Sequence, residues 1–205
     1  MSLKKILLIT ITCFITYSTL GQKLYVWCPE QPVVKQRIGF LDNQEINIII
    51  FDGRSLPPKS KIECQSEDIT NAIFNVVRTA YPSAKINLLK ESDYYKKPET
   101  GKITLKIGIV AYQAGFGVDV TVGVGNIGGN FSYGLISKSE WNGITGYYAQ
   151  IFDNRNSEKK FVKEISKIES KSNIWGYKTA KTCLNTTFGE ANQELLFFID
   201  NSLME

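Results

Sequence analysis

The sequence predicts a single α+β domain in which an antiparallel or mixed β-sheet carries two principal amphipathic helices on one face. Two stretches repeat apolar residues at the spacing of a helix, and several others alternate apolar and polar residues as strands do. No linker rich in Pro, Gly or Ser divides residues 22–205, whose length suits one domain with its own core. We therefore expect one domain over these residues, behind a separate N-terminal segment.

Residues 1–21 have the three zones of a secretory signal peptide. The start, MSLKK, is basic, residues 6–17 are uncharged and mostly apolar, and small residues lead to Gly21, after which cleavage would expose Gln22. The apolar run is too short for an ordinary membrane span, and no later stretch approaches one. We therefore expect an exported protein whose mature chain has no transmembrane segment. Its location would be periplasmic or secreted, with a peripheral position at the outer membrane also open.

In the front half we expect two strands and then a helix. Leu24–Trp27 predicts a short strand, and Glu45–Phe51 predicts a buried strand because its isoleucines leave no polar face. The Asp-Gly-Arg and Pro-Pro segments that follow end this strand, since proline cannot continue a central one. Ser66 can cap a helix whose apolar residues, from Ile69 to Ala80, form a single stripe before a Tyr-Pro pair stops it.

The middle of the chain is expected to be mainly strands. Lys102–Tyr112 alternates strictly between apolar and polar residues, which predicts an antiparallel strand with one face exposed. Further strands are expected at Ala84–Lys90, Val118–Val124, Asn130–Ser137 and Thr145–Phe152. Trp141–Gly143 is interpreted as a turn before the last of them. The consecutive strands would form a meander or a small twisted sheet.

Two helical segments are expected towards the C-terminus. Ser157–Ile168 carries apolar residues at helical spacing, which predicts a short helix. Lys178–Leu203 carries a longer stripe with spacings of mostly three and four, which predicts an amphipathic helix packed on the sheet. This long helix and the one in the front half are the two principal helices of the predicted fold.

Three cysteines remain after the expected cleavage: Cys28, Cys64 and Cys183. An exported protein meets oxidising conditions, so one disulfide is expected, and Cys28 and Cys64 are the preferred pair because they flank the first long strand. Cys183 lies on the apolar face of the long helix, where a cysteine usually behaves as a small hydrophobic residue. The chain has no CxxC motif, so neither a zinc knuckle nor a redox dithiol is predicted.

Composition excludes several classes of function. The chain has no histidine, which removes Ser-His-Asp and Cys-His catalysis and histidine metal sites but leaves carboxylate chemistry open. Its formal net charge is only +4, so bulk charge does not predict a nucleic-acid partner. A GxGxxG match, Gly123–Gly128, leads into turn and strand residues, whereas a dinucleotide site needs a helix there. We expect neither a cofactor nor a metal.

Two similar segments, IIIFDGR and QIFDNR, each place an Asp-x-Arg sequence after a strand. In one interpretation, Asp52 and Asp153 act as acid and base, as two carboxylates do in glycoside hydrolysis, and the arginines bind an anion. In the other, each carboxylate bonds its own turn and pairs with the arginine two residues on, Arg54 or Arg155. Ordinary turn chemistry explains both copies, so we favour the structural interpretation and predict no catalytic residue.

Aromatic residues in or beside the predicted strands are the candidates for binding: Tyr133, Trp141, Tyr147 and Tyr148. Neighbours along a strand point to opposite faces, so one of the adjacent pair Tyr147 and Tyr148 can face solvent. Exposed aromatic rings bind sugars or partner chains. Core packing and cross-strand pairing explain most of the aromatic residues of this chain.

The order of these segments resembles that of small accessory domains of bacterial envelopes, namely curli-secretion-channel-like and transport-auxiliary lipoprotein domains. The stretches that carry the resemblance are IIIFDGR, ITNAIFNVVRTAY and ITLKIGIVAY, and it covers roughly residues 46–203. It implies an assembly or interaction module without catalytic residues. Those relatives usually carry a lipidated cysteine directly after the signal peptide, where this chain has Gln22.

These observations predict an exported, non-enzymatic accessory protein that supports the assembly or transport of another envelope component. Its partner would be another envelope protein, bound through an exposed strand edge or an aromatic sheet face. The alternative is a secreted carbohydrate-binding protein, or a carbohydrate-active one that uses Asp52, Asp153 and exposed aromatic residues, so a glycan is a second candidate ligand. The two differ in geometry, because carboxylates that catalyse together must face one cleft.

Overall fold

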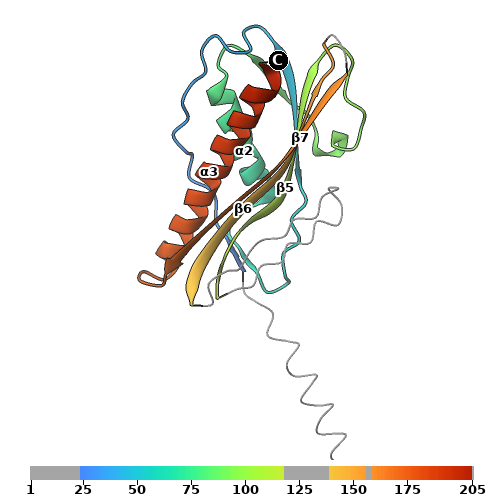
Figure 1. The fold of residues 1–205 in the computed structure, drawn as a ribbon. Coiled ribbons are helices and arrows are strands. Elements are labelled where there is room, and N and C mark those ends of the chain that lie inside the picture. The colour runs from blue at the N-terminus through green and yellow to red at the C-terminus, as the bar shows by residue number, and fades with distance from the viewer. Residues whose placement is uncertain (1–23, 118–138, 156–157, 205) are drawn as a thin grey trace, which may run out of the picture.

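The computed structural model describes residues 24–117, 139–155 and 158–204. Among them, seven strands form one sheet: β1 (Leu24–Val26), β2 (Glu45–Asp52), β3 (Lys61–Ile62), β4 (Lys85–Leu88), β5 (Ile103–Phe116), β6 (Glu140–Asp153) and β7 (Lys159–Ser172). The helices are α2 (Ser66–Ala80), α3 (Tyr177–Leu203) and the short 3-10 helix η1 (Glu91–Asp93) (Figure 1).

The three long strands β5, β6 and β7 form an antiparallel ribbon, and the shorter strands line the other side of β5. Two of these shorter strands, β1 and β2, pair directly with β5. β2 runs parallel to the first half of β5, up to Asp52 opposite Ile109, and β1 runs antiparallel to its end, where Leu24 lies opposite Gly115. β4 extends β2 and β3 extends β1, both in parallel. The sheet is therefore mixed.

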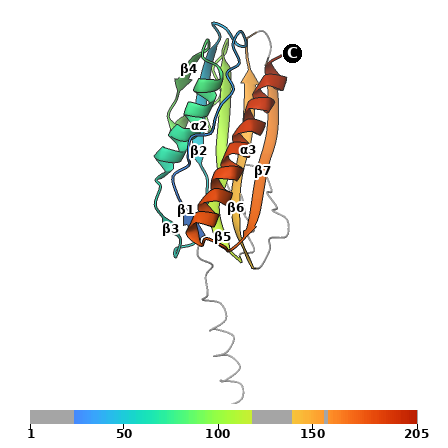
Figure 2. The same cartoon turned by 90° about the vertical axis from the view of Figure 1, so that its left-hand side faces the viewer.

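Both helices lie on the same face of this sheet, with α2 beside α3 (Figure 2). The core fills the space between the helices and the sheet, and its largest fully buried side chains include Tyr81, Tyr112, Tyr147 and Phe188. α3 packs against β5, β6 and β7, while α2 packs against β2. The predicted fold class, a sheet with two principal helices on one face, is confirmed.

The helix α2 begins with a different cap from the expected one. Gln65 is the N-cap residue, with extended backbone angles, and Ser66 is the first helical residue. The Asp68 carboxylate accepts the backbone N–H of Gln65 at 3.2 Å, and acidic residues in the first turn suit the positive end of the helix dipole. The Ser66 hydroxyl bonds instead to Asp52 and so joins the start of α2 to the end of β2.

The expectation of a half-exposed strand at Lys102–Tyr112 is wrong, because β5 is buried on both faces except at its last residue. The segment that contains η1 covers Lys106 of this strand. The buried Lys106 ammonium donates to the carbonyl oxygens of Tyr94 at 2.7 Å and Lys96 at 2.6 Å. The charge of Lys106 is therefore satisfied by backbone carbonyls rather than by solvent.

The short helix expected at Ser157–Ile168 is also wrong, because this part of the chain forms β7. Ile165 is buried and Phe161 packs on the core, so the residues on one face of the strand alternate with exposed ones. On the same face, Lys163 and Lys167 form ion pairs with Glu194 of α3, at 3.1 and 2.6 Å. Over so short a stretch, apolar spacing fits a helix or a strand, and pairing with β6 along its whole length decides for the strand.

The turn expected at Trp141–Gly143 lies inside β6, which begins at Glu140. Gly143 has a packing reason for its place in a strand. A Cβ atom added there would lie 2.5 Å from the backbone carbon of Cys183 and 2.6 Å from the backbone nitrogen of Leu184. Glycine therefore marks a point where the backbone of α3 approaches the sheet closely, as glycines within strands often do.

Several expectations fall outside the described residues: the signal peptide at 1–21, the strands at Val118–Val124 and Asn130–Ser137, and the GxGxxG segment at Gly123–Gly128. The remaining predicted strands are confirmed as β1, β2, β4, β5 and β6. None of the described helices combines the length and the apolar character that crossing a membrane requires.

Candidate functional site

The two Asp-x-Arg segments form the same local structure, each at the end of a strand. Asp52 Oδ1 accepts the backbone N–H of Arg54 at 3.2 Å and its Nε at 2.7 Å, while Oδ2 accepts a second guanidinium nitrogen at 2.6 Å. The corresponding distances between Asp153 and Arg155 are 3.2, 2.8 and 2.6 Å. Each carboxylate therefore bonds its own turn and holds the guanidinium in a bidentate pair.

The two pairs differ in their surroundings. The Arg54 side chain is 5% exposed and also donates to the carbonyl oxygen of Tyr112 in β5, whereas Arg155 is 31% exposed and reaches Gln44. Burial alone would raise the pKa of Asp52, but the hydrogen bonds and charge of Arg54, with the Ser66 hydroxyl, outweigh it and hold the pKa below its ordinary value. The hydrogen bonds of Arg155 likewise lower the pKa of Asp153. Both carboxylates are ionised partners, so neither is prepared to act as a general acid.

The two aspartates lie far apart along the sheet. Asp52 of β2 lies opposite Ile109 of β5, and Asp153 of β6 lies opposite Ile103 on the other side of the same strand. Six residues of strand span roughly 20 Å, whereas the two carboxylates of glycosidases are about 5 to 10 Å apart. The structure does not bring Asp52 and Asp153 together around one bond.

Two of the aromatic candidates for binding are buried. Trp141 and Tyr147 lie in the core, where Trp141 Nε1 donates to Asn173 at 3.0 Å and the Tyr147 hydroxyl contacts Asn192 at 3.4 Å. Their neighbours in α3 cover them, so neither ring presents a binding surface. Tyr148 is half-buried on the opposite face of the sheet, in a cluster with Tyr94, and Tyr133 lies outside the described residues.

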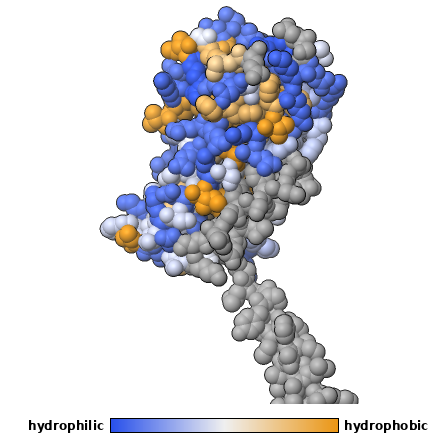
Figure 3. All heavy atoms as spheres, in the orientation of Figure 1, coloured by the Kyte–Doolittle hydropathy of each residue, from blue (hydrophilic) through white to orange (hydrophobic). Residues whose placement is uncertain are grey.

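The exposed aromatic surface lies elsewhere, at the turn between β7 and α3. We call it the end patch: Phe116, Ile174, Trp175 and Tyr177, all exposed. Ile174 and Trp175 are each 73% exposed. In Figure 3 the lower left end of the molecule shows one small hydrophobic group among pale and hydrophilic spheres, since tryptophan and tyrosine are not hydrophobic on the scale that colours this view. Sequence analysis missed this patch, although an Ile-Trp pair amid polar residues at the end of a strand is an available signal.

The end patch rests on a cluster of aromatic rings. The Tyr177 hydroxyl lies 3.2 Å from that of Tyr25, and its ring centroid is 5.8 Å from that of Trp141. The ring centroid of Phe116 lies 5.5 Å from that of Trp141. Residues from β1, β5, β6 and α3 thus fix the base of the patch, while its outer side chains face solvent.

A cavity of about 420 Å³ opens beside Trp175. Its wall includes Lys171 at the end of β7, together with Lys178 and Thr182 in the first turns of α3. An apolar anchor, a cavity and lysine side chains therefore meet at one end of the molecule.

The expected disulfide between Cys28 and Cys64 is present, and Cys183 is a free, buried thiol. The Asp68 carboxylate lies 3.9 Å from the Cys28 sulfur and 3.8 Å from the Cys64 sulfur. This trio superficially resembles a metal-ligand set. Because a metal ligand must be a thiolate and these sulfurs are bonded to each other, the group cannot hold a metal in this form.

No protein-family model and no curated protein sequence matches this chain. Solved structures similar to it include XCC0632 from Xanthomonas campestris, described as DUF330, at 8% identity and a TM-score of 0.49, covering 89% of this chain and 99% of that one. Lipoprotein GNA1162 from Neisseria meningitidis matches at 10% identity and 0.31, with 75% and 98% covered. Rare lipoprotein B from Shewanella oneidensis matches at 8% and 0.36, with 78% and 99% covered.

These similar structures are described as a DUF330 protein and two lipoproteins, all from bacteria. They do not identify a specific family. Their identities of 8 to 10% and TM-scores below 0.5 give no information on what this chain binds.

Proposed function

We propose that this chain is an exported, non-enzymatic accessory protein that binds another envelope protein through the end patch and supports the assembly or transport of that partner. The observation that carries the proposal is the exposure of Ile174 and Trp175 on one turn, each at 73%. Large apolar side chains gathered at one exposed site commonly mark a protein interface. Tryptophan and tyrosine are also the residues most enriched among binding hot spots.

Rigid support makes this patch suitable for binding. Tyr177 is held by Tyr25 and Trp141, so little conformational entropy is lost when a partner packs against its ring. Lys171 and Lys178 border the neighbouring cavity and supply the polar rim that surrounds the apolar centre of a typical interface. The patch therefore combines an anchor, a cavity and a rim within one end of the molecule.

Export and the absence of catalysis rest on separate support. The zones of residues 1–21 are those of a signal peptide, and the bond between Cys28 and Cys64 suits an oxidising compartment. The chain has no histidine, and Asp52 and Asp153 are each committed to a local arginine. These features favour an interaction role over hydrolysis.

The test is affinity capture of the tagged protein from its native envelope fraction after mild crosslinking. A double variant, Ile174→Ser with Trp175→Ser, should lose the partner that the wild-type chain retains. The matched control is Ile38→Ser with Tyr95→Ser, because these side chains are 79% and 64% exposed at other sites. Equal capture by the wild-type chain and the end-patch variant would overturn the proposal.

The carbohydrate alternative keeps one observation in its favour, since Trp175 stands exposed beside a cavity where a sugar ring can stack on it. A glycan array distinguishes carbohydrate binding from the proposed binding of a protein partner. A glycan bound by the wild-type chain and lost in Trp175→Ser, without any captured protein, would replace the proposed function with carbohydrate binding.

A further inference from the structure

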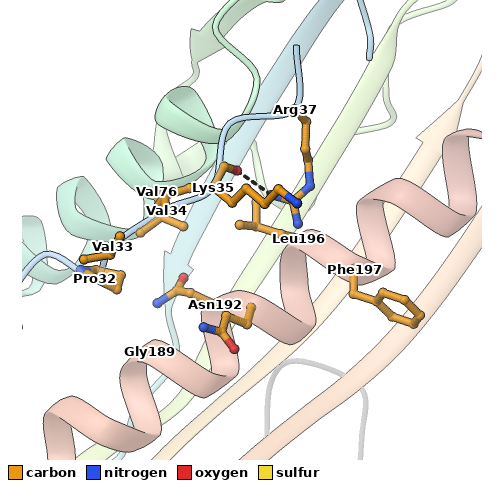
Figure 4. A pocket seen from close by; sticks show the side chains of 11 residues that line it. Pro32, Val33, Val34, Lys35, Arg37, Val76, Gly189, Asn192, Leu196 and Phe197 are labelled. Atoms are coloured by element: carbon orange, nitrogen blue, oxygen red, sulfur yellow. Dashed lines mark hydrogen bonds between the residues drawn. The ribbon is translucent and has the colours of Figure 1, made fainter. Parts of the chain in front are cut away.

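We propose that a second cavity, between α2, α3 and the segment 32–37, binds an acyl chain whose head carries a hydrogen-bond donor and a carboxylate. We call it the helix cavity. Its volume is about 310 Å³, within the range of small-molecule sites. Figure 4 shows it between the helix α3 and the irregular segment that begins at Pro32, with Val76 of α2 beside it.

The walls of the helix cavity are aliphatic over most of their area. Pro32, Val33 and Val34 come from the segment before β2, and Val76 and Leu196 come from the two helices. Val33 is 98% exposed, although a valine side chain gains free energy when it leaves water. A bound acyl chain would cover this side chain and fill the space between the helices.

Gly189 enlarges this cavity. It lies inside α3, where glycine weakens a helix because the unfolded backbone has more freedom to lose. A Cβ atom added at Gly189 would meet nothing within 4 Å, so no close contact requires glycine there. Gly143 is the opposite case, because the backbone of α3 fills the space where its side chain would be. Glycine at position 189 therefore leaves space in the helix cavity that a side chain would fill.

Asn192 supplies an unused acceptor at the cavity wall. Its side-chain nitrogen donates to the carbonyl oxygen of Phe188 at 2.8 Å and to the Tyr147 hydroxyl at 3.4 Å. Because the Phe188 carbonyl can only accept, this contact fixes which end of the amide is nitrogen. The residue is 1% exposed, yet its Oδ1 has no partner among the described residues. A buried acceptor without a partner is costly, and a ligand hydroxyl or amide N–H would satisfy it.

The charges at the cavity indicate the head group. Arg37 is already committed, since its Nε donates to Asp200 at 2.6 Å and a further nitrogen donates to the carbonyl of Lys35. Within the described part of the chain, the Lys35 ammonium has no hydrogen bond or ion pair. This cation can therefore pair with a carboxylate on the ligand. Aliphatic walls, one acceptor and one cation together fit an amphiphile such as a β-hydroxy fatty acid.

The test is isothermal titration calorimetry on the chain without residues 1–21. The probes are β-hydroxyoctanoate, its methyl ester and octanoate. We expect β-hydroxyoctanoate to bind, and octanoate to bind about fivefold more weakly because it lacks the donor for Asn192. The methyl ester should bind a few-fold more weakly because it lacks the charge for Lys35.

Three variants locate the site. Gly189→Leu should fill the helix cavity and reduce affinity at least about tenfold, while its higher helix propensity keeps the helix intact. Asn192→Ala should abolish the advantage of β-hydroxyoctanoate over octanoate, and Lys35→Gln should abolish the advantage of the acid over its ester. The control Lys97→Gln should bind as the wild-type chain does.

Two outcomes would overturn this inference: no measurable binding of any probe by the wild-type chain, or undiminished binding by a Gly189→Leu variant that keeps the wild-type circular dichroism.

The inference is independent of the proposed function. Gly189→Leu leaves the end patch untouched, so capture of a protein partner should persist in that variant, and loss of capture in the end-patch variant should leave binding of the probes unchanged.

Discussion

The two Asp-x-Arg pairs share their local geometry but differ in burial, so they allow the effect of burial on an ion pair to be tested apart from geometry. Their hydrogen bonds have nearly equal lengths, but the Arg54 side chain is 5% exposed and that of Arg155 is 31% exposed. A buried carboxylate that loses its partner keeps the full cost of desolvation. The Asp153 carboxylate is itself only 15% exposed, close to the 11% of Asp52, but its arginine lies much more in solvent, so water can reach Asp153 once the guanidinium is removed and less stability is lost. The same motif should therefore respond differently to the same substitution.

Arg54→Met should lower the free energy of unfolding by about 3 kcal/mol, because it leaves Asp52 buried without its partner. Arg155→Met should lower it by less than about 1 kcal/mol. Urea unfolding of both variants, followed by circular dichroism, measures the difference. Losses of equal size would contradict the argument that burial separates the pairs.

Gly143 in β6, which faces α3, and Gly189 within α3 allow a second comparison. Gly143→Ala should destabilise the fold by at least about 3 kcal/mol, because the new Cβ would meet the backbone of Cys183 and Leu184 in α3. Gly189→Ala should stabilise it by about 0.5 to 1 kcal/mol, because the space is empty and alanine favours the helix. Melting temperatures of the two variants should move in opposite directions, and a shift of the same sign would refute the comparison.

At the scale of elements, β7 shows that the spacing of apolar residues over a short stretch does not distinguish a helix from a strand. Phe161, Ile165 and Ile168 fit a helical stripe, but Phe161 and Ile165 also fit one face of a strand, so a short pattern cannot decide between the two structures. The strand forms because β6 offers a partner along its whole length and because Glu194 of α3 pairs with its lysines. Both the pairing with β6 and the ion pairs with Glu194 are tertiary contacts, which the spacing of residues in this segment does not reveal. The long stripe of α3 and the continuous isoleucines of β2 needed no such context and were predicted correctly.

The candidate site was harder to predict for a related reason. Alternation along a strand tells which side chains share a face, but it does not tell which face a helix covers. Trp141 and Tyr147 were therefore kept among the candidates for binding, although both are buried. Trp175 was overlooked because it lies in the turn between two elements, where no periodicity applies. The Asp-x-Arg turns were predicted well, since their contacts are local in sequence.

Cys28 follows the short strand β1, and Cys64 follows the short strand β3. The disulfide therefore crosslinks the chain just after these two strands. Its closed loop spans a sequence separation of 36, for which chain entropy suggests a stabilisation of about 4 kcal/mol. We expect the double variant Cys28→Ala with Cys64→Ala to unfold at a correspondingly lower urea concentration. Wild-type protein treated with reductant should behave as the variant does. An unchanged midpoint after complete reduction would show that the crosslink contributes nothing.

For the whole molecule, the lack of histidine and the two kinds of shifted group define how stability depends on pH. The charges of Lys102 and Lys85 lower the pKa of Glu45, and arginine partners lower those of Asp52 and Asp153. On the alkaline side, a hydrogen bond to Tyr177 raises the pKa of Tyr25 to about 12. Burial raises those of the core tyrosines, Tyr81, Tyr94, Tyr112 and Tyr147.

The sign of each effect follows from which state binds more protons. A carboxyl group with a lowered pKa in the folded state contributes stability that is present above its ordinary pKa and is lost as the pH falls through the folded value. A tyrosine with a raised pKa contributes stability that is present below its ordinary pKa and is lost as the pH rises towards the folded value. Burial lowers the pKa of Lys106, which opposes the alkaline loss, but the shifted tyrosines outnumber this one lysine.

We therefore expect a broad plateau of stability, with the melting temperature nearly constant between about pH 6 and pH 9 because no side chain with a pKa near 6.5 is present. The melting temperature should fall below about pH 5, as the paired carboxylates are protonated, and above about pH 10, as unfolded tyrosines ionise. Differential scanning calorimetry across this range measures the profile, and Arg155→Met should make the acid limb shallower because Asp153 loses its favourable partner. A melting temperature that slopes steadily across pH 6 to 9 would show that a group other than these carboxylates and tyrosines governs the stability of the fold.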